Sequence, residues 1–107
     1  MSIKSMNATE LNEILNANEP IILIDCREQH EWDEGRIEKA IHIPLGQIED
    51  RLSEIPDKNA KIVIQCRSGK RSMRAAELLD DEGYSDLTNL EGGIFGWQDN
   101  NLKIIKG

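Results

Sequence analysis

The stretch KIVIQCRSGKRSMRAAELLDDEG, residues 61–83, contains an apolar strand, a polar loop and an amphipathic helix in direct succession. Ile62 to Ile64 form a β-branched, continuously apolar run, which favours a strand buried on both faces. Apolar residues then recur at intervals of three: Met73, Ala76 and Leu79. That spacing predicts the apolar face of a helix over roughly residues 72–82, and Gly83 suits the position just after its last turn. The stretch therefore predicts a buried strand that leads through a short loop into a helix.

The segments before this stretch extend the same pattern. Ile21 to Ile24 form a second short apolar run, and we interpret both runs as central parallel strands. Asn7 and Glu10 have the spacing of a capping box, which predicts a first helix over roughly residues 8–17, ended by Pro20. Apolar residues at helical spacing predict another helix between the two strands: Ile48, Leu52 and Ile55.

Strands and helices thus alternate, which predicts an α/β fold with a mainly parallel central sheet flanked by helices. No repeat, low-complexity segment or flexible linker interrupts the chain. We therefore expect residues 1–107 to form a single domain, and its 107 residues are too few for two well-formed cores.

Composition excludes several classes of function. The longest apolar run has four residues, against about 20 for a membrane span. The first residues, MSIKSMNATELNEILN, lack the apolar stretch and cleavage pattern of a signal peptide. We therefore expect a cytoplasmic protein without a membrane partner. In that compartment Cys26 and Cys66 are expected to be thiols.

Charge is distributed unevenly along the chain. The net charge is −7, yet residues 58–74 contain six cations and no acid, so this segment carries +6 and the remainder carries −7 − 6 = −13. Nucleic-acid binding requires a broad positive potential, usually with interleaved aromatic residues, and we expect no nucleic-acid partner. A small anion bound at one place fits this distribution better, and a solvated basic helix face is the alternative.

The loop after the predicted strand carries the candidate chemistry. Cys66 stands at the strand-to-helix turn, where ligands bind in parallel α/β sheets. Successive loop N–H groups, the helix dipole and a positive φ at Gly69 all favour an anion there. With the neighbouring cations, they predict a Cys66 pKa below that of a free thiol and a nucleophile near neutral pH. An inert buried cysteine is the alternative, which the polar surroundings disfavour.

Three motifs together resemble the rhodanese family of single-domain sulfurtransferases, over about Met6 to Trp97. The first runs from Asp25-Cys26-Arg27-Glu28 through Glu31-Trp32, Gly35, Ile37, Ala40, Ile43 and Pro44; the second is Cys66 to Ser72; the third is Glu91-Gly92-Gly93 followed by Trp97. The chain departs from the family pattern at four positions, where Arg36, Lys39, Asn101 and Lys103 stand in place of His, Gly, Gly and Pro. None of these touches the proposed nucleophile, but Lys39 affects the turn at the pocket rim, and Asn101 can adopt the left-handed conformation of a glycine.

The resemblance implies an enzyme that moves sulfane sulfur from a donor such as thiosulfate through a persulfide on Cys66, without metal or cofactor. It implies that the rest of the loop binds the anionic donor: Arg67, Ser68, Gly69, Lys70, Arg71 and Ser72. The acceptor is expected to be a thiol or a cyanide-like nucleophile, including a protein thiol, and we expect a monomer. The alternative is a non-catalytic persulfide carrier or a module that docks a partner.

Other readings of the same residues are weaker. A cysteine phosphatase requires C-x5-R, but the sixth residue after Cys66 is Ser72. Gly69-Lys70 lacks the first glycine of a P-loop, because position 64 is Ile64. Four side chains could in principle bind zinc, without C-x2-C spacing: Cys26, His30, His42 and Cys66.

The remaining candidates receive structural roles. Cys26 is expected to be a small buried residue at the end of the first central strand. The other assignments are an ion-paired scaffold of Asp25, Arg27 and Glu31, surface or hydrogen-bonded structural histidines His30 and His42, and core or pocket-wall aromatics Trp32 and Trp97.

Overall fold

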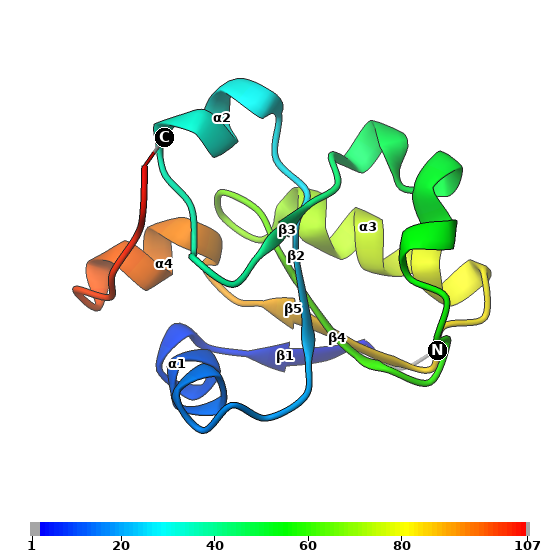
Figure 1. Cartoon of the computed structure of the whole chain (residues 1–107), viewed down its shortest axis with the longest axis horizontal. Coiled ribbons are helices and arrows are strands. Elements are labelled where there is room, and N and C mark those ends of the chain that lie inside the picture. The colour runs from blue at the N-terminus through cyan, green and yellow to red at the C-terminus, as the bar shows by residue number, and fades with distance from the viewer. Residues whose placement is uncertain (1–2, 107) are drawn as a thin grey trace.

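A five-stranded sheet organises the computed structural model, which describes residues 3–106 (Figure 1). Its strands are β1 (Lys4–Met6), β2 (Ile22–Asp25), β3 (Ile41–His42), β4 (Lys61–Gln65) and β5 (Asp86–Leu90). They lie in the order β1-β5-β4-β2-β3, and every neighbouring pair is parallel. The two predicted strands are therefore confirmed as parallel neighbours in the interior of the sheet, with β4 at its centre.

Helices cover both faces of this sheet. They are α1 (Ala8–Asn16), α2 (Gln29–Glu34), α3 (Lys70–Asp81) and α4 (Gly93–Asp99). Side chains of α1 and α4 pack on one face, around Leu11, Val63 and Trp97. Side chains of α3 pack on the other face, around Ile64 and Leu79. Because both faces are covered, the central strands are continuously apolar, as expected of a buried parallel sheet.

The two long helices follow their sequence signals closely. The side chain of Asn7 accepts the Glu10 N–H at 2.9 Å, and the Asn7 N–H donates to the Glu10 carboxylate at 3.2 Å, so the capping box that predicts α1 is confirmed. Helix α3 begins two residues earlier than predicted, at Lys70. Gly83, with φ +93°, follows it as predicted.

The helix predicted around Ile48, Leu52 and Ile55 is wrong in type. Two short 3-10 helices occupy this region, η1 (Leu45–Gln47) and η2 (Glu49–Glu54), and the backbone of Arg51 leaves the helical region. Ile55 precedes Pro56, a position that disfavours α conformation, and it ends the segment at φ −129° and ψ 67°. The spacing still describes the packing, because Ile48 and Ile55 are buried against the face covered by α3.

Within residues 3–106, none of the helices has the length and apolar character that a membrane crossing requires.

Candidate active site

The carboxyl ends of β2 and β4 bring the two cysteines of the chain together. Asp25 and Gln65 are register partners, and the N–H of Cys26 donates to the Gln65 carbonyl at 2.9 Å. Cys26 and Cys66 are therefore neighbours one residue beyond the paired strands. Both are free thiols, with 0% and 1% of their surface exposed.

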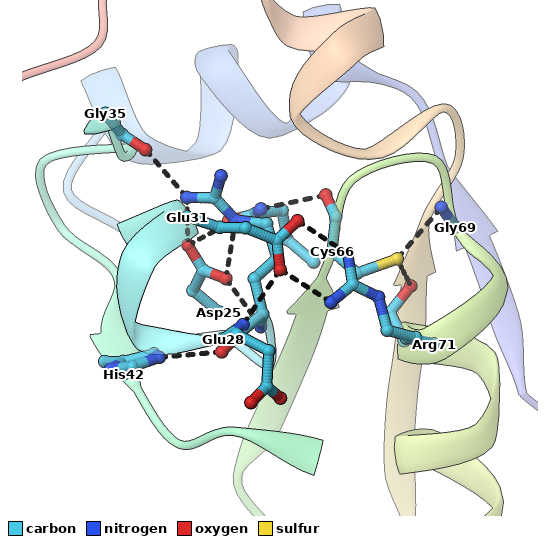
Figure 2. Close-up of polar contacts among 11 residues, drawn as sticks. Asp25, Glu28, Glu31, Gly35, His42, Cys66, Gly69 and Arg71 are labelled. Atoms are coloured by element: carbon cyan, nitrogen blue, oxygen red, sulfur yellow. Dashed lines mark hydrogen bonds and ion pairs between the residues drawn. The ribbon is translucent and has the colours of Figure 1, made fainter. Parts of the chain in front are cut away.

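The turn from β4 into α3 aims hydrogen-bond donors at the Cys66 sulfur. The Gly69 N–H donates to Cys66 Sγ at 3.0 Å (Figure 2). The Ser72 hydroxyl lies 3.4 Å from the same atom. Gly69 caps α3 at φ +109°, a conformation that a residue with a Cβ rarely adopts. The sulfur therefore lies at the positive end of a helix of 12 residues.

A side chain from β5 anchors this loop. Asn89 donates from Nδ2 to the Gly69 carbonyl at 3.2 Å and accepts from the Ser72 hydroxyl through Oδ1. Since a hydroxyl has one proton, Ser72 donates either to Asn89 or to the sulfur at any moment. Nothing in the sequence pattern marked Asn89, a polar residue of β5 whose surface is only 7% exposed.

These contacts favour the thiolate of Cys66. A hydrogen bond from the Cys26 thiol is the largest contribution, and donors on Ser72 and Gly69 add to it; together they lower the pKa of Cys66 to about 4, against the effect of burial. The pKa of Cys26 is raised, chiefly by that same hydrogen bond and by burial. These opposite shifts favour the negative charge on Cys66 and the proton on Cys26.

The cations of residues 58–74 do not all gather at this loop. Lys61 begins β4 and Lys58 donates to the Glu82 carbonyl, so both lie at the amino ends of the strands, opposite the loop. The five residues of β4, at about 3.3 Å each, separate them from the loop by about 16 Å. Arg67, Lys70 and Arg71 belong to the loop itself. Only the later part of the segment that carries +6 therefore lies at the loop.

Within the loop, the three cations have different surroundings. Arg67 is exposed and lies over the ring of Phe95, 5.3 Å from its centre. Lys70 is exposed at the start of α3. Arg71 is paired with Glu31 of α2 by two hydrogen bonds of 2.7 and 2.9 Å, and Figure 2 shows this pair beside Cys66.

The predicted ion-paired scaffold therefore divides into two parts. Asp25 and Arg27 form a buried pair at 2.7 Å, and Arg27 also donates to the Gly35 carbonyl at 2.7 Å. Glu31 instead binds Arg71 of the loop, whose guanidinium lowers the pKa of Glu31 to about 2. The assignment of Glu31 to a scaffold with Arg27 was incomplete, because the spacing within one segment could not show a partner on α3.

The turn that begins α4 packs directly under the Cys66 loop. Ile94 donates its N–H to the Cys66 carbonyl at 2.8 Å, and Phe95 donates to the Arg67 carbonyl at 3.2 Å. Gly93 has φ +56°, and a Cβ at this position would lie 2.5 Å from the Cys66 carbonyl oxygen. This close approach explains why a glycine stands there.

A cleft of about 400 Å³ lies between α2 and α4 and borders the loop through Arg67. Its lining residues are Arg27, His30, Glu31, Glu34, Gly35, Arg67, Ile94, Phe95, Gln98 and Ile104. Cys66, which is 1% exposed, is not among these residues, so the cleft borders the loop and not the sulfur itself.

The other candidate residues take structural positions. His42 contacts the Arg27 carbonyl at 2.8 Å and stacks on Trp32, while Trp97 is buried and donates to the Lys103 carbonyl. Asn101 adopts φ +58°, the left-handed conformation proposed for it. Among residues 3–106, no three His, Cys, Asp or Glu side chains are grouped closely enough to hold a metal ion.

Comparisons with known proteins agree with this architecture. Residues 7–100 match the family described as Rhodanese-like domain. The chain is 40% identical to "Putative sulfurtransferase YtwF" of Bacillus subtilis, over 92% of this chain and 93% of that protein. It is 37% identical to "Sulfurtransferase" of Allochromatium vinosum, over 96% and 95% of the two chains.

A solved structure gives the same result. The crystal structure of a rhodanese-like domain protein from Staphylococcus aureus superimposes with a TM-score of 0.85 at 35% identity, covering 96% of this chain and 99% of that one. The chain therefore belongs to the rhodanese family. The names of its relatives support a sulfurtransferase kind of activity.

Proposed function

We propose that this protein transfers sulfane sulfur through a persulfide on Cys66, with thiosulfate as a donor. The observation that carries the proposal is the Cys66 sulfur at the start of α3, which receives the Gly69 N–H at 3.0 Å and has a pKa lowered to about 4. Such a sulfur is ionised at neutral pH and needs no general base to become a nucleophile.

The reaction has two steps. In the first, the Cys66 thiolate attacks the outer sulfur of thiosulfate; a new S–S bond forms, the S–S bond of thiosulfate breaks, and its electron pair leaves with sulfite. In the second, a nucleophilic acceptor, a thiol or cyanide, attacks the outer sulfur of the persulfide, and Cys66 leaves as a thiolate. The low pKa of Cys66 supports the second step because a stable thiolate is a good leaving group.

The loop residues supply the binding of the anionic donor. Arg67, Ser68 and Lys70 are exposed and flank Cys66, so they are the residues we assign to the first contact with thiosulfate. Gly69 contributes its N–H, which is held in place by the turn. Arg71 and Ser72 already have partners in Glu31 and Asn89, so we assign them to holding the loop and the charge on its sulfur.

The cleft beside Arg67 is our candidate site for the acceptor. It is large enough for a small-molecule thiol or the side chain of a protein partner, and it opens next to the loop.

Intact mass spectrometry tests the proposal directly. Reduced protein incubated with thiosulfate is expected to gain one sulfur atom, which cyanide then removes. Cys66→Ser is expected to gain none, whereas Cys26→Ser, which keeps the nucleophile, still gains it. Persistent labelling of Cys66→Ser would overturn the assignment of the nucleophile.

The same assay separates the enzyme from the carrier. Saturable turnover of free thiosulfate with cyanide supports a thiosulfate sulfurtransferase. Loading only from a persulfidated protein, with negligible turnover of thiosulfate, would instead identify a carrier that receives sulfur from a partner.

A further inference from the structure

The second cysteine is placed to react with the first. Cys26 and Cys66 follow register partners on adjacent parallel strands, and the N–H of Cys26 is bonded to the residue before Cys66. Adjacent strands lie about 4.8 Å apart, which is within the range of Cα separations of about 4.4–6.8 Å found in disulfides.

Their side chains also point to the same side of the sheet. The residues two positions earlier, Ile24 and Ile64, are register partners, and all four side chains belong to one buried cluster with Ala76 and Leu79 of α3. The proximity of the two thiols lowers the pKa of Cys66 and raises the pKa of Cys26. Since Cys26 is fully buried, Cys66 is the sulfur that it can reach.

The backbone on both sides is fixed. The Cys26 carbonyl accepts the Leu45 N–H at 3.0 Å, and the Cys66 carbonyl accepts the Ile94 N–H at 2.8 Å. A bond between the two sulfurs therefore requires changes in side-chain torsion rather than movement of a strand.

We propose that Cys26 is the resolving thiol of Cys66, so that peroxide converts the pair into a reversible intramolecular disulfide. The Cys66 thiolate attacks one oxygen of the peroxide, the O–O bond breaks, and hydroxide leaves, which gives a sulfenic acid on Cys66. The Cys26 sulfur then attacks Cys66 Sγ, the S–O bond breaks, and the departing hydroxide takes the Cys26 proton as water. Two electrons pass from the two sulfurs to the peroxide.

This arrangement protects the nucleophile of the site. A sulfenic acid exposed to more peroxide advances to sulfinic acid, which thiols do not reduce. A thiol in contact with the sulfenic acid reacts first, because an intramolecular partner has a high effective concentration. The disulfide also occupies the sulfur that would carry the persulfide, so the oxidised protein is inactive in sulfur transfer until it is reduced.

Hydrogen peroxide is the probe for the test, because it is small enough to reach a sulfur that is only 1% exposed. Reduced wild type is treated with an excess of peroxide, denatured in an alkylating agent, and its intact mass is measured. We expect the mass of two hydrogen atoms to be lost, no alkylation, and one peptide pair joined through Cys26 and Cys66 after digestion. Dithiothreitol is expected to restore both thiols and sulfur loading.

The matched variants are Cys26→Ser and Cys26→Ala, with folding checked by circular dichroism. Both are expected to gain oxygen atoms on Cys66 under the same treatment and to lose sulfur loading that dithiothreitol does not restore. The proposal is overturned if Cys66 of the wild type also gains oxygen, as located by peptide mapping, or if the wild type forms disulfide-linked dimers. If neither variant folds, the peptide mapping of the oxidised wild type tests the proposal alone, and absence of the peptide pair joined through Cys26 and Cys66 overturns it.

The sulfur-transfer proposal is tested separately by thiosulfate loading of the same reduced wild-type preparation. The disulfide requires the Cys66 thiolate but no sulfur donor or acceptor, so either proposal can fail while the other stands.

Discussion

Replacing Gly93 with alanine tests whether the turn before α4 holds the Cys66 loop in place. The new Cβ would lie 2.5 Å from the Cys66 carbonyl oxygen and 2.6 Å from the carbonyl carbon and oxygen of Arg67. These atoms are backbone, so they cannot turn aside as the end of a flexible side chain can. The turn and the loop must separate, which disturbs the hydrogen bonds from Ile94 and Phe95 to the same two carbonyls.

The expected loss of stability is the sum of two contributions. A non-glycine residue at φ +56° costs about 1–2 kcal/mol, partly offset by about 0.4–1 kcal/mol from a less flexible unfolded chain. Two weakened backbone hydrogen bonds cost about 0.5–1.5 kcal/mol each. We therefore expect Gly93→Ala to lower the free energy of unfolding by about 3 kcal/mol.

Gly83→Ala is the matched control. Gly83 also has a positive φ, +93°, but a Cβ there would meet only the side chain of Lys58, at 3.8 Å. It lies at the far end of α3 from Cys66, so Gly83→Ala isolates the backbone effect, about 1 kcal/mol. The difference of about 2 kcal/mol between the variants corresponds to a difference in Tm of roughly 10 °C.

Two assays check this prediction. Urea denaturation gives the two free energies, and intact mass after timed exposure to thiosulfate gives the rate of sulfur loading. Because a displacement of about 1 Å can reduce a rate by about 100-fold, Gly93→Ala is expected to load sulfur far more slowly than Gly83→Ala. Equal stability of the two variants, together with equal loading rates, would refute the role assigned to this turn.

Three further predictions follow from the contacts of single residues. Iodoacetamide should alkylate Cys66 at a nearly constant rate from pH 7 down to about pH 5, because the pKa of Cys66 is about 4. Cys66→Ser is the control. A rate that rises only near the pKa of a free thiol, about 8.5, would contradict the lowered pKa. Glu31→Gln should lower the free energy of unfolding by about 1 kcal/mol near neutral pH. Since the pKa of Glu31 is lowered from 4.5 to about 2, the stabilisation by its charge is fully present above pH 4.5 and is lost towards pH 2. The free energies of unfolding of the wild type and Glu31→Gln, measured by urea denaturation, should therefore converge between these pH values. A constant difference would exclude the charge as the cause. Tyr84→Phe should destabilise the fold by about 1–2 kcal/mol, because it leaves the buried Ile55 carbonyl without its O–H donor. Sulfur loading should stay at the wild-type rate, because Tyr84 lies at the amino ends of the strands and Cys66 at their carboxyl ends. Slower loading would mean that the two ends of the sheet are coupled.

Local signals allowed the centre of the fold to be predicted from the sequence. The run Ile62 to Ile64, the glycine in the loop and the three-residue spacing of α3 are all properties of one segment, and the structure reproduces them in order. The short elements escaped prediction because they lack periodicity: β3 has two residues, β1 has three, and α2 has six. Strand β5 escaped for another reason, because its sequence DLTNL buries two polar residues, Thr88 and Asn89.

The partners of the loop could not be predicted because they come from other segments. The sequence places Arg71 beside Cys66, but only the packing of α2 on the loop shows that its charge is paired with Glu31. Likewise, the sequence predicts only that Cys26 is a small core residue. Its position beside Cys66 depends on β2 and β4 being neighbours in register. Local pattern predicts which segment carries the chemistry, whereas the surroundings of the sulfur depend on strand order.

The electrostatics of the site follow from these tertiary partners rather than from the count of cations in the loop. Arg71 is neutralised by Glu31, and Arg67 is exposed over Phe95, so neither donates a hydrogen bond to the sulfur. The donors that do reach the sulfur belong to Gly69 and Ser72, which are partly buried and buried, so their effect is weakly screened by salt. The stability of the thiolate should therefore depend on how β2, β5 and α4 hold the loop, while the exposed cations act mainly on the approach of an anionic donor.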